Sequence, residues 1–213
     1  MILRIKTRFA RAARRTKLKR AWFGRNRAGI FAAILPTLLS LSSGVPARAQ
    51  TSASVEYQVK AAFLLNFARF VEWPADAFEN ENSPITFCVF RQDPFGSALA
   101  DITQDKSIDN RNLIVHHVQN LSDLKACQLV FVSDAADRDL PAVLDTLKAS
   151  SALVVGESDG FAERGGGIQF YLEAEKVRFS VNVDATKRAR LNVSSKLLSL
   201  AKIVHDAIPP KGD

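Results

Sequence analysis

Short runs of apolar residues recur along the chain from residue 85 onward, and segments with helical periodicity separate them. Runs of four to eight apolar residues bounded by polar turns are typical of buried strands, whereas apolar positions three and four residues apart are typical of helices. Their alternation predicts a largely parallel sheet with helices on its faces. The expected strands are residues 85–90, 113–118, 128–132 and 152–155, and the expected helices are residues 94–102, 121–126 and 140–149.

The rhythm changes after residue 156. Residues 168–172 and 177–183 have strand character, and the charged residues 173–176 separate them, which predicts an antiparallel hairpin added to the sheet. Two helices are expected to close the chain, at residues 184–190 and 194–204, and the second has an apolar stripe. The pattern therefore predicts one α/β domain with a mostly parallel central sheet, flanking helices and an antiparallel C-terminal hairpin.

A further helix is expected ahead of the first strand. Ser54 is a suitable N-cap, Glu56 lies in the first turn where the helix dipole favours an acid, and Trp73-Pro74 ends the helix. Drawn at 100° per residue, Lys60 lies in the middle of an apolar arc. The arc comprises Phe63, Leu64, Phe67, Phe70 and Val71.

The position of Lys60 needs an explanation, because an ammonium group among phenylalanines is costly to bury. Either its apolar stem lets the charge reach solvent from the helix end, or the charge has a carboxylate partner inside the fold. The first is the simpler interpretation. The second would make Lys60 a structural or binding residue.

Charge is unevenly distributed along the chain. The whole sequence has a formal charge of +7, but residues 1–49 contain twelve Lys and Arg residues and no acid. The remaining 17 bases stand against 22 acids, which gives residues 50–213 a formal charge of −5. We therefore expect no nucleic-acid partner, and the basic cluster of Lys187, Arg188 and Arg190 is better explained as a solvated helix face.

Residues 1–49 have the parts of a secretory signal peptide: a basic start, an apolar stretch over residues 28–45 and a small-x-small motif that ends at Ala49. We predict cleavage between Ala49 and Gln50 and export of residues 50–213 as one soluble domain. The alternative is that the apolar stretch is retained as a membrane anchor, although Pro36 weakens it as a spanning helix.

The sequence contains two cysteines, Cys88 and Cys127, and both lie in the part expected to be exported. An even number of cysteines in an oxidising compartment favours one disulfide, which would here connect two apolar, strand-like runs. The alternative is a pair of buried free thiols.

The strongest enzymatic motif is Gly-x-Ser-x-Gly at residues 156–160, which directly follows an expected strand, as a nucleophile elbow does. An elbow also needs a helix behind Ser158 and a downstream acid and histidine. The glycines at 165–167 interrupt any such helix, and His205 is expected in the last turn of the closing helix. A turn at the end of a strand explains the motif better than catalysis does.

Metal and cofactor sites are not expected. The glycines at 165–167 lie beside Arg164 and bring backbone amides close together, but they lack the Lys-Ser/Thr of a phosphate-binding loop and open no helix. His116 and His117 are adjacent in a strand, so their side chains point to opposite faces and do not chelate one metal.

Several motifs together resemble the YfiR family of exported bacterial proteins. Residues 55–74 contain its Tyr-x-x-Lys-Ala-Ala-Phe-Leu start and its Phe-x-x-Trp-Pro end. Residues 160–170 are similar to its glycine turn, residues 177–182 to the strand that follows, and residues 191–198 to its closing helix. The motifs occur in the family's order over nearly the whole expected domain.

The resemblance implies a periplasmic regulator that is not an enzyme. Members form dimers that bind the periplasmic part of a membrane diguanylate cyclase and hold it inactive, which controls cyclic-di-GMP and biofilm formation. Release is coupled to redox state or to an outer-membrane lipoprotein. An alternative is a periplasmic module that binds a small ligand and serves another membrane protein, such as a histidine kinase.

The resemblance also bears on individual residues. It matches Cys88 and Cys127 to a disulfide pair of the family, while a second pair found in some members is missing, so redox switching through that pair is not expected here. Independently of the resemblance, Phe70 and Trp73 are candidates for partner binding or for core packing, because large aromatic residues at a helix end serve either role. Lys60 and Arg164 are the other two candidates for a partner-binding or structural site.

Overall fold

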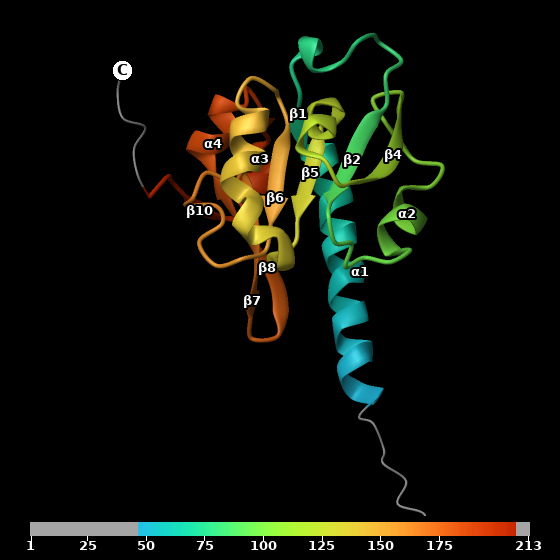
Figure 1. The fold of residues 1–213 in the computed structure, drawn as a ribbon, viewed down its shortest axis with the longest axis vertical. Coiled ribbons are helices and arrows are strands. Elements are labelled where there is room, and N and C mark those ends of the chain that lie inside the picture. The colour runs from blue at the N-terminus through green and yellow to red at the C-terminus, as the bar shows by residue number, and fades with distance from the viewer. Residues whose placement is uncertain (1–46, 208–213) are drawn as a thin grey trace, which may run out of the picture. The chain divides into compact units, whose positions relative to one another are not determined.

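The computed structural model describes residues 47–207, with side chains from residue 54 onward. The described chain folds into one α/β domain around an eight-stranded mixed sheet, with a separate two-stranded sheet (Figure 1). The strands are β1 (Val71–Glu72), β2 (Ile85–Phe90), β3 (Ser107–Ile108), β4 (Arg111–Val118), β5 (Leu129–Val132), β6 (Leu153–Gly156), β7 (Ile168–Glu173), β8 (Lys176–Asn182), β9 (Asn192–Val193) and β10 (Lys202–Val204). The helices are α1 (Ala47–Phe70), α2 (Ala98–Thr103), α3 (Leu140–Leu147), α4 (Val183–Arg188) and α5 (Ser195–Leu198), with 3-10 helices η1 (Ala75–Ala77), η2 (Leu121–Ala126) and η3 (Asp134–Asp139).

The strand order of the main sheet is β10-β8-β7-β6-β5-β2-β4-β3. Strands β4, β2, β5, β6 and β7 pair in parallel, and β7 and β8 form the expected antiparallel hairpin. The predicted fold class is therefore confirmed. Helical segments join β2, β4, β5 and β6, as the alternating sequence pattern indicated, whereas a turn without a helix joins β6 to its parallel neighbour β7.

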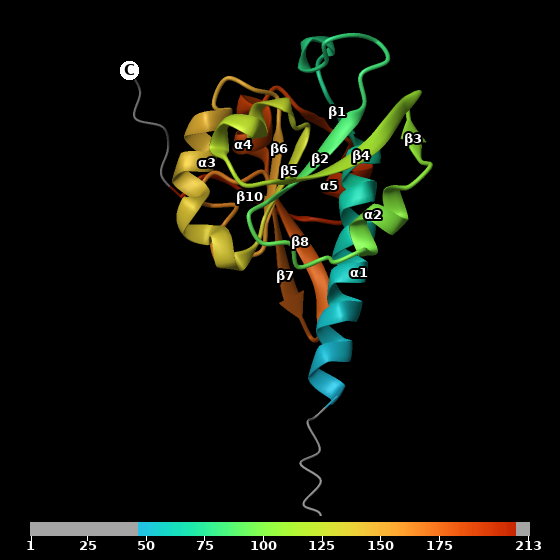
Figure 2. The same cartoon turned by 45° about the vertical axis from the view of Figure 1, so that its right-hand side comes forward.

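Two apolar clusters cover the two faces of the sheet, and the central strands contribute to both. In β2, Phe87 and Val89 belong to the cluster beneath α1, whereas Cys88 and Phe90 belong to the cluster beneath α3. Figure 2 shows α1 and α3 on opposite sides of the sheet. Because both faces are covered, all six residues of β2 are buried, which explains its continuous apolar sequence.

Helix α1 packs through phenylalanine rings. Phe63 and Phe67 lie with ring centroids 5.0–6.1 Å from those of Phe170 and Phe179 on the β7–β8 hairpin. These are ordinary distances for favourable aromatic pairs. The apolar arc expected from the sequence is therefore the face that α1 presents to the sheet.

A disulfide joins Cys88 in β2 to Cys127, the residue after η2, and confirms the expected bond. Both cysteines are buried in the cluster beneath α3. The bond connects β2 to the segment that leads into the neighbouring strand β5.

The prediction of a closing helix at residues 194–204 is wrong. Only α5 is helical there, and Lys202–Val204 forms β10, which pairs in parallel with β8 at the edge of the sheet. The short segment instead pairs with the free edge of β8, and tertiary pairing overrides local helix propensity. His205 consequently follows a strand, where its Nδ1 lies 2.8 Å from Asp184 Oδ2.

Three smaller expectations also differ from the structure. Helix α1 begins no later than Ala47, so Ser54 is an interior residue and not an N-cap. The helix ends at Phe70, before Trp73-Pro74, because Val71 and Glu72 pair with β9. The helix expected at 94–102 is confined to α2, whose preceding residues form a turn.

The signal peptide remains a prediction. Residues 1–46 lie outside the described part of the chain, and the backbone of Ala49 and Gln50 lies in the first turn of α1. None of the described helices has the length and apolar character that a membrane span requires.

Candidate functional site

The carboxyl edge of the parallel strands is the natural place for a site in this fold. Strand β2 lies between β4 and β5, so the chain adds strands on one side of β2 and then on the other. In open α/β sheets the crevice at such a reversal is where ligands usually bind. The residues that follow β5 and β6, among them Asp134 and Glu157, lie at this edge.

Lys60 lies in this region and is buried, with 5% of its surface exposed. Its Nζ is 2.5 Å from Glu56 Oε1, one turn earlier on α1, and 2.6 Å from Glu157 Oε2, directly after β6. Nζ also lies 4.6 Å from the centre of the Tyr57 ring. Of the two interpretations offered by the sequence, the simpler one is wrong: Lys60 does not reach solvent but has carboxylate partners.

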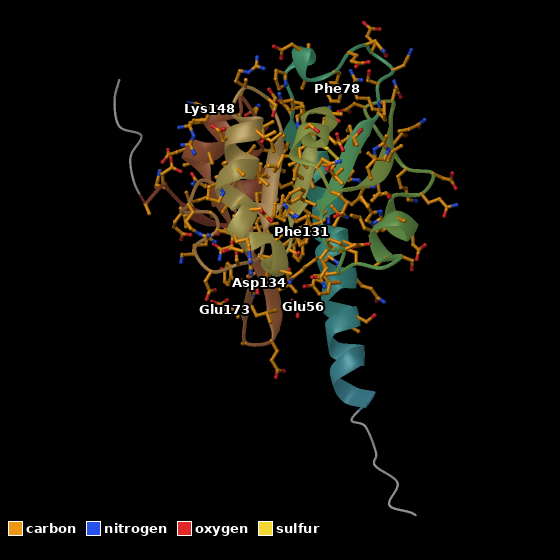
Figure 3. The ribbon with its side chains drawn as sticks, viewed as in Figure 1. Glu56, Phe78, Phe131, Asp134, Lys148 and Glu173 are labelled. Atoms are coloured by element: carbon orange, nitrogen blue, oxygen red, sulfur yellow. A yellow bond between two sulfur atoms is a disulfide. The ribbon has the colours of Figure 1, made fainter. Side chains whose placement is uncertain are left out.

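Glu157 is the centre of this group, which we call the Lys60 cluster (Glu56, Tyr57, Lys60 and Glu157). Its carboxylate accepts hydrogen bonds from the Tyr57 hydroxyl at 3.0 Å and from the backbone N–H of Asp134 at 3.1 Å, in addition to the Lys60 ion pair. Only 7% of its side chain is exposed. A buried carboxylate is stable when several donors surround it. Because these donors come from α1 and from the segment after β5, and Glu157 itself follows β6, the cluster joins α1 to the ends of both strands. Glu56 and Asp134 are labelled in Figure 3 where α1 passes this edge.

The electrostatics of the Lys60 cluster affect Tyr57 most. Burial raises the pKa of the Tyr57 hydroxyl well above its ordinary value, and the nearby charge and hydrogen bond of Glu157 raise it further. Tyr57 therefore stays protonated and acts as a hydrogen-bond donor to Glu157.

A second group, the Asp137 cluster (Asp137, Ser158 and Arg164), adjoins the first. Arg164 donates from Nη2 to Asp137 Oδ1 at 2.5 Å and from Nη1 to Oδ2 at 3.0 Å, and the Ser158 hydroxyl donates to the same carboxylate. The hydrogen bond from Arg164 holds the pKa of Asp137 below its usual range, and the same bond raises the pKa of Arg164. The fork-shaped contact fixes the turn after β6 against η3.

The position of Ser158 decides how the Gly-x-Ser-x-Gly motif is understood. Its hydroxyl is held by Asp137 and accepts from Arg164 Nη2 at 3.0 Å. Within residues 54–207, its hydrogen-bond partners include no histidine: His117 contacts Asp93 and His205 contacts Asp184. A strand-end turn stabilised by an Asp–Arg pair accounts for the motif.

The two aromatic candidates, Phe70 and Trp73, lie away from the Lys60 cluster. Phe70 is ten residues further along α1, which corresponds to about 15 Å of helix. Its half-buried ring packs against the core and lies 5.5 Å from Lys196 Nζ. Trp73 is also half-buried, and its indole N–H donates to the carbonyl of Gln128 at 3.1 Å. Of the four candidates, the structure brings Arg164 next to the turn that carries Glu157 and leaves the two aromatic residues apart.

Sequence reasoning missed Glu157, Asp134 and Asp137. A usable signal existed, because each acid follows a buried strand, and the carboxyl ends of parallel neighbours meet at one edge. The pairing of Lys60 with Glu157 spans 97 positions, which residue spacing does not reveal.

A model of the YfiR/HmsC-like family matches residues 57–202, which is most of the chain and nearly all of the described domain. The chain belongs to the YfiR/HmsC-like family. This confirms the resemblance found in the sequence. The family is regulatory and non-catalytic, and its members are periplasmic proteins of diguanylate cyclase signalling.

Two solved structures resemble the chain remotely. A conserved domain protein from Vibrio cholerae O1 biovar El Tor is 8% identical, with a TM-score of 0.45 over 69% of this chain and 59% of that chain. An ABC domain from Streptococcus pneumoniae in complex with L-Trp is also 8% identical, with a TM-score of 0.45 over 70% of this chain and 60% of that chain. The YfiR/HmsC-like chain thus spans about three fifths of the length of these two proteins.

Proposed function

We propose that this protein binds the periplasmic part of an inner-membrane diguanylate cyclase and represses it, which lowers cellular cyclic-di-GMP. Membership of the YfiR/HmsC-like family over residues 57–202 carries the proposal. The secretory signal expected at residues 1–49 supports a periplasmic location. The disulfide supports it too, because such bonds persist in oxidising compartments.

The protein acts by binding and not by catalysis in this proposal. The polar side chains at the carboxyl edge of the sheet support this, because Glu157, Asp137 and Ser158 are each engaged by donors or acceptors of the domain itself. They are therefore suited to hold α1 and the turn after β6 in place. The acting form is a homodimer, and an outer-membrane lipoprotein is proposed as the partner that relieves repression.

Among the candidate partner residues, Phe70 is the one that we assign to the cyclase-binding surface. Lys60, Trp73 and Arg164 use their polar atoms in bonds within the domain, which favours a structural role for them. Phe70 has no polar atoms that could form such bonds, and its ring is only half-buried. Phe70→Ala is expected to weaken cyclase binding while the domain stays folded.

Deletion of the gene tests the proposed function. We expect cellular cyclic-di-GMP to rise, and we expect the full chain supplied in trans to restore the original level. A chain that starts at residue 50 and stays in the cytoplasm is the matched control and should not restore it. Unchanged cyclic-di-GMP after deletion would contradict the proposal.

A further inference from the structure

A cavity of about 530 Å³ lies away from the Lys60 cluster, between the end of α3, the start of β6, the turn before β7, and α4. Its size is that of pockets that hold small molecules. The walls are mostly apolar, with Leu144, Leu153, Ala185 and Leu191 among the lining residues. Lys148, which is labelled in Figure 3, lies exposed at its rim.

The turn before β7 is a rigid wall of this cavity. The fully buried ring of Phe161 occupies the space beside Gly156 and Gly166, where an added Cβ would come within 2.2 Å of the ring in each case. The glycines therefore allow the ring to lock the turn in place. A ligand would meet this wall already formed.

Asn182 connects three parts of the chain that surround the cavity. It is fully buried, donates to the carbonyl of Ala162 at 2.6 Å and to Asp206 Oδ1 at 2.9 Å, and accepts from the backbone N–H of Ala185 at 3.0 Å. These bonds join the turn, the segment after β10 and the start of α4. A pocket whose walls are fixed in this way loses little entropy when it binds a ligand.

The charges around the cavity leave two carboxylates, those of Glu163 and Asp145, without a partner among the described residues. Arg188 forms a two-pronged contact with Asp206, and Arg164 is engaged by Asp137. Glu163 Oε2, by contrast, is buried and has no hydrogen-bond partner among the residues that the structure describes. Because Oε2 is closed to solvent, a cationic donor in the cavity would pair with Oε1, the other oxygen of this carboxylate, for which the described residues provide no partner either.

We propose that this cavity binds a small apolar amine, with the ammonium group against Glu163 and the apolar body against the leucine-lined walls. The apolar lining selects the body and the unpartnered carboxylate selects the charge. The site does not depend on the proposed cyclase partner, since it is defined by its own walls and charge.

Calorimetric titration of the mature protein with 2-phenylethylamine tests the proposal. We expect saturable binding at one site, while phenylacetate, which carries the opposite charge on a similar body, does not bind. Glu163→Gln should weaken binding of the amine by about tenfold or more, because it removes the charged acceptor. Glu175→Gln, in the exposed β7–β8 turn, is the matched control and should leave the affinity unchanged.

A second variant keeps the test decisive if Glu163→Gln fails to fold. Ala189→Phe places a large ring in the cavity from the end of α4 and should abolish binding, with folding checked by circular dichroism. Two results would overturn the proposal: no saturable binding of the amine to the wild-type protein at millimolar concentration, or undiminished binding to either folded variant.

Discussion

Lys60 is a charged residue that the fold buries. Its ammonium group lies between Glu56 and Glu157 on the apolar side of α1, with the Tyr57 ring close by. The sequence revealed the unusual position, because Lys60 falls within an arc of phenylalanines. It did not reveal the partner, because Glu157 belongs to a distant turn whose place depends on the order of the strands.

Replacement of Lys60 by methionine removes the cation and leaves the carboxylates of Glu56 and Glu157 facing one another. We expect Lys60→Met to lower the free energy of unfolding by roughly 3 kcal/mol, as is usual when one partner of a buried ion pair is removed. Urea denaturation at pH 7 measures the change. Glu56→Gln is the control and should cost under about 1 kcal/mol, because Lys60 keeps Glu157. A Lys60→Met protein within about 0.5 kcal/mol of wild type would contradict the assignment.

The Asp137–Arg164 pair makes stability depend on pH. The pKa of Asp137 is lowered in the folded protein, chiefly by the hydrogen bond from Arg164. Its contribution is therefore complete above the unfolded pKa of about 3.9 and is lost as the pH falls through the lower folded value.

Arg164→Gln is expected to cost about 1 kcal/mol at pH 7, since both side chains are partly exposed and water screens the pair. The difference from wild type should shrink below about pH 4, where Asp137 of the unfolded chain takes up a proton, and disappear once the pH falls below the lowered pKa of Asp137 in the folded protein. Urea denaturation at pH 7 and pH 3 measures both values. Arg178→Gln, which breaks a looser exposed pair with Glu173, should change stability little at either pH. A constant Arg164→Gln effect across this range would contradict the role of Asp137.

At the scale of elements, strands with continuous apolar sequence were predictable and very short strands were not. Strand β2 was placed at its observed residues because burial on both faces leaves an unbroken apolar run. The two-residue pairing of β1 with β9 matches Val71 to Val193, so its partner is remote in the sequence. Strand β10 was mistaken for helix because three residues show no reliable period, and only the edge of β8 decides their conformation.

The disulfide ties two of these elements together across a sequence separation of 39 residues. The double variant Cys88→Ala/Cys127→Ala should lose roughly 2–4 kcal/mol of unfolding free energy, because the unfolded chain gains conformational freedom. Denaturation of the oxidised wild type and the variant measures the loss. Because both cysteines are buried, dithiothreitol should reduce the bond in the wild type only when the domain is also unfolded. A variant as stable as the wild type would contradict a stabilising role.

At the scale of the whole molecule, the described domain is one α/β body with α1 packed on one face of the sheet and α3 on the other (Figure 2). The Lys60 and Asp137 clusters both stabilise the carboxyl edge of the sheet, where α/β enzymes usually place reactive groups. Here the polar groups of that edge are used to hold the fold together. This arrangement suits a regulator that presents a fixed surface to a partner, as proposed for this member of the YfiR/HmsC-like family.

Direct binding tests this account most clearly. The mature domain, residues 50–213, is titrated by calorimetry with the periplasmic domain of the membrane diguanylate cyclase encoded nearest to its gene, and with an unrelated periplasmic sensor domain as control. The account predicts saturable binding to the cyclase domain alone, weakened by Phe70→Ala without loss of folding. No binding to the cyclase domain, with the disulfide intact and the protein folded, would contradict it.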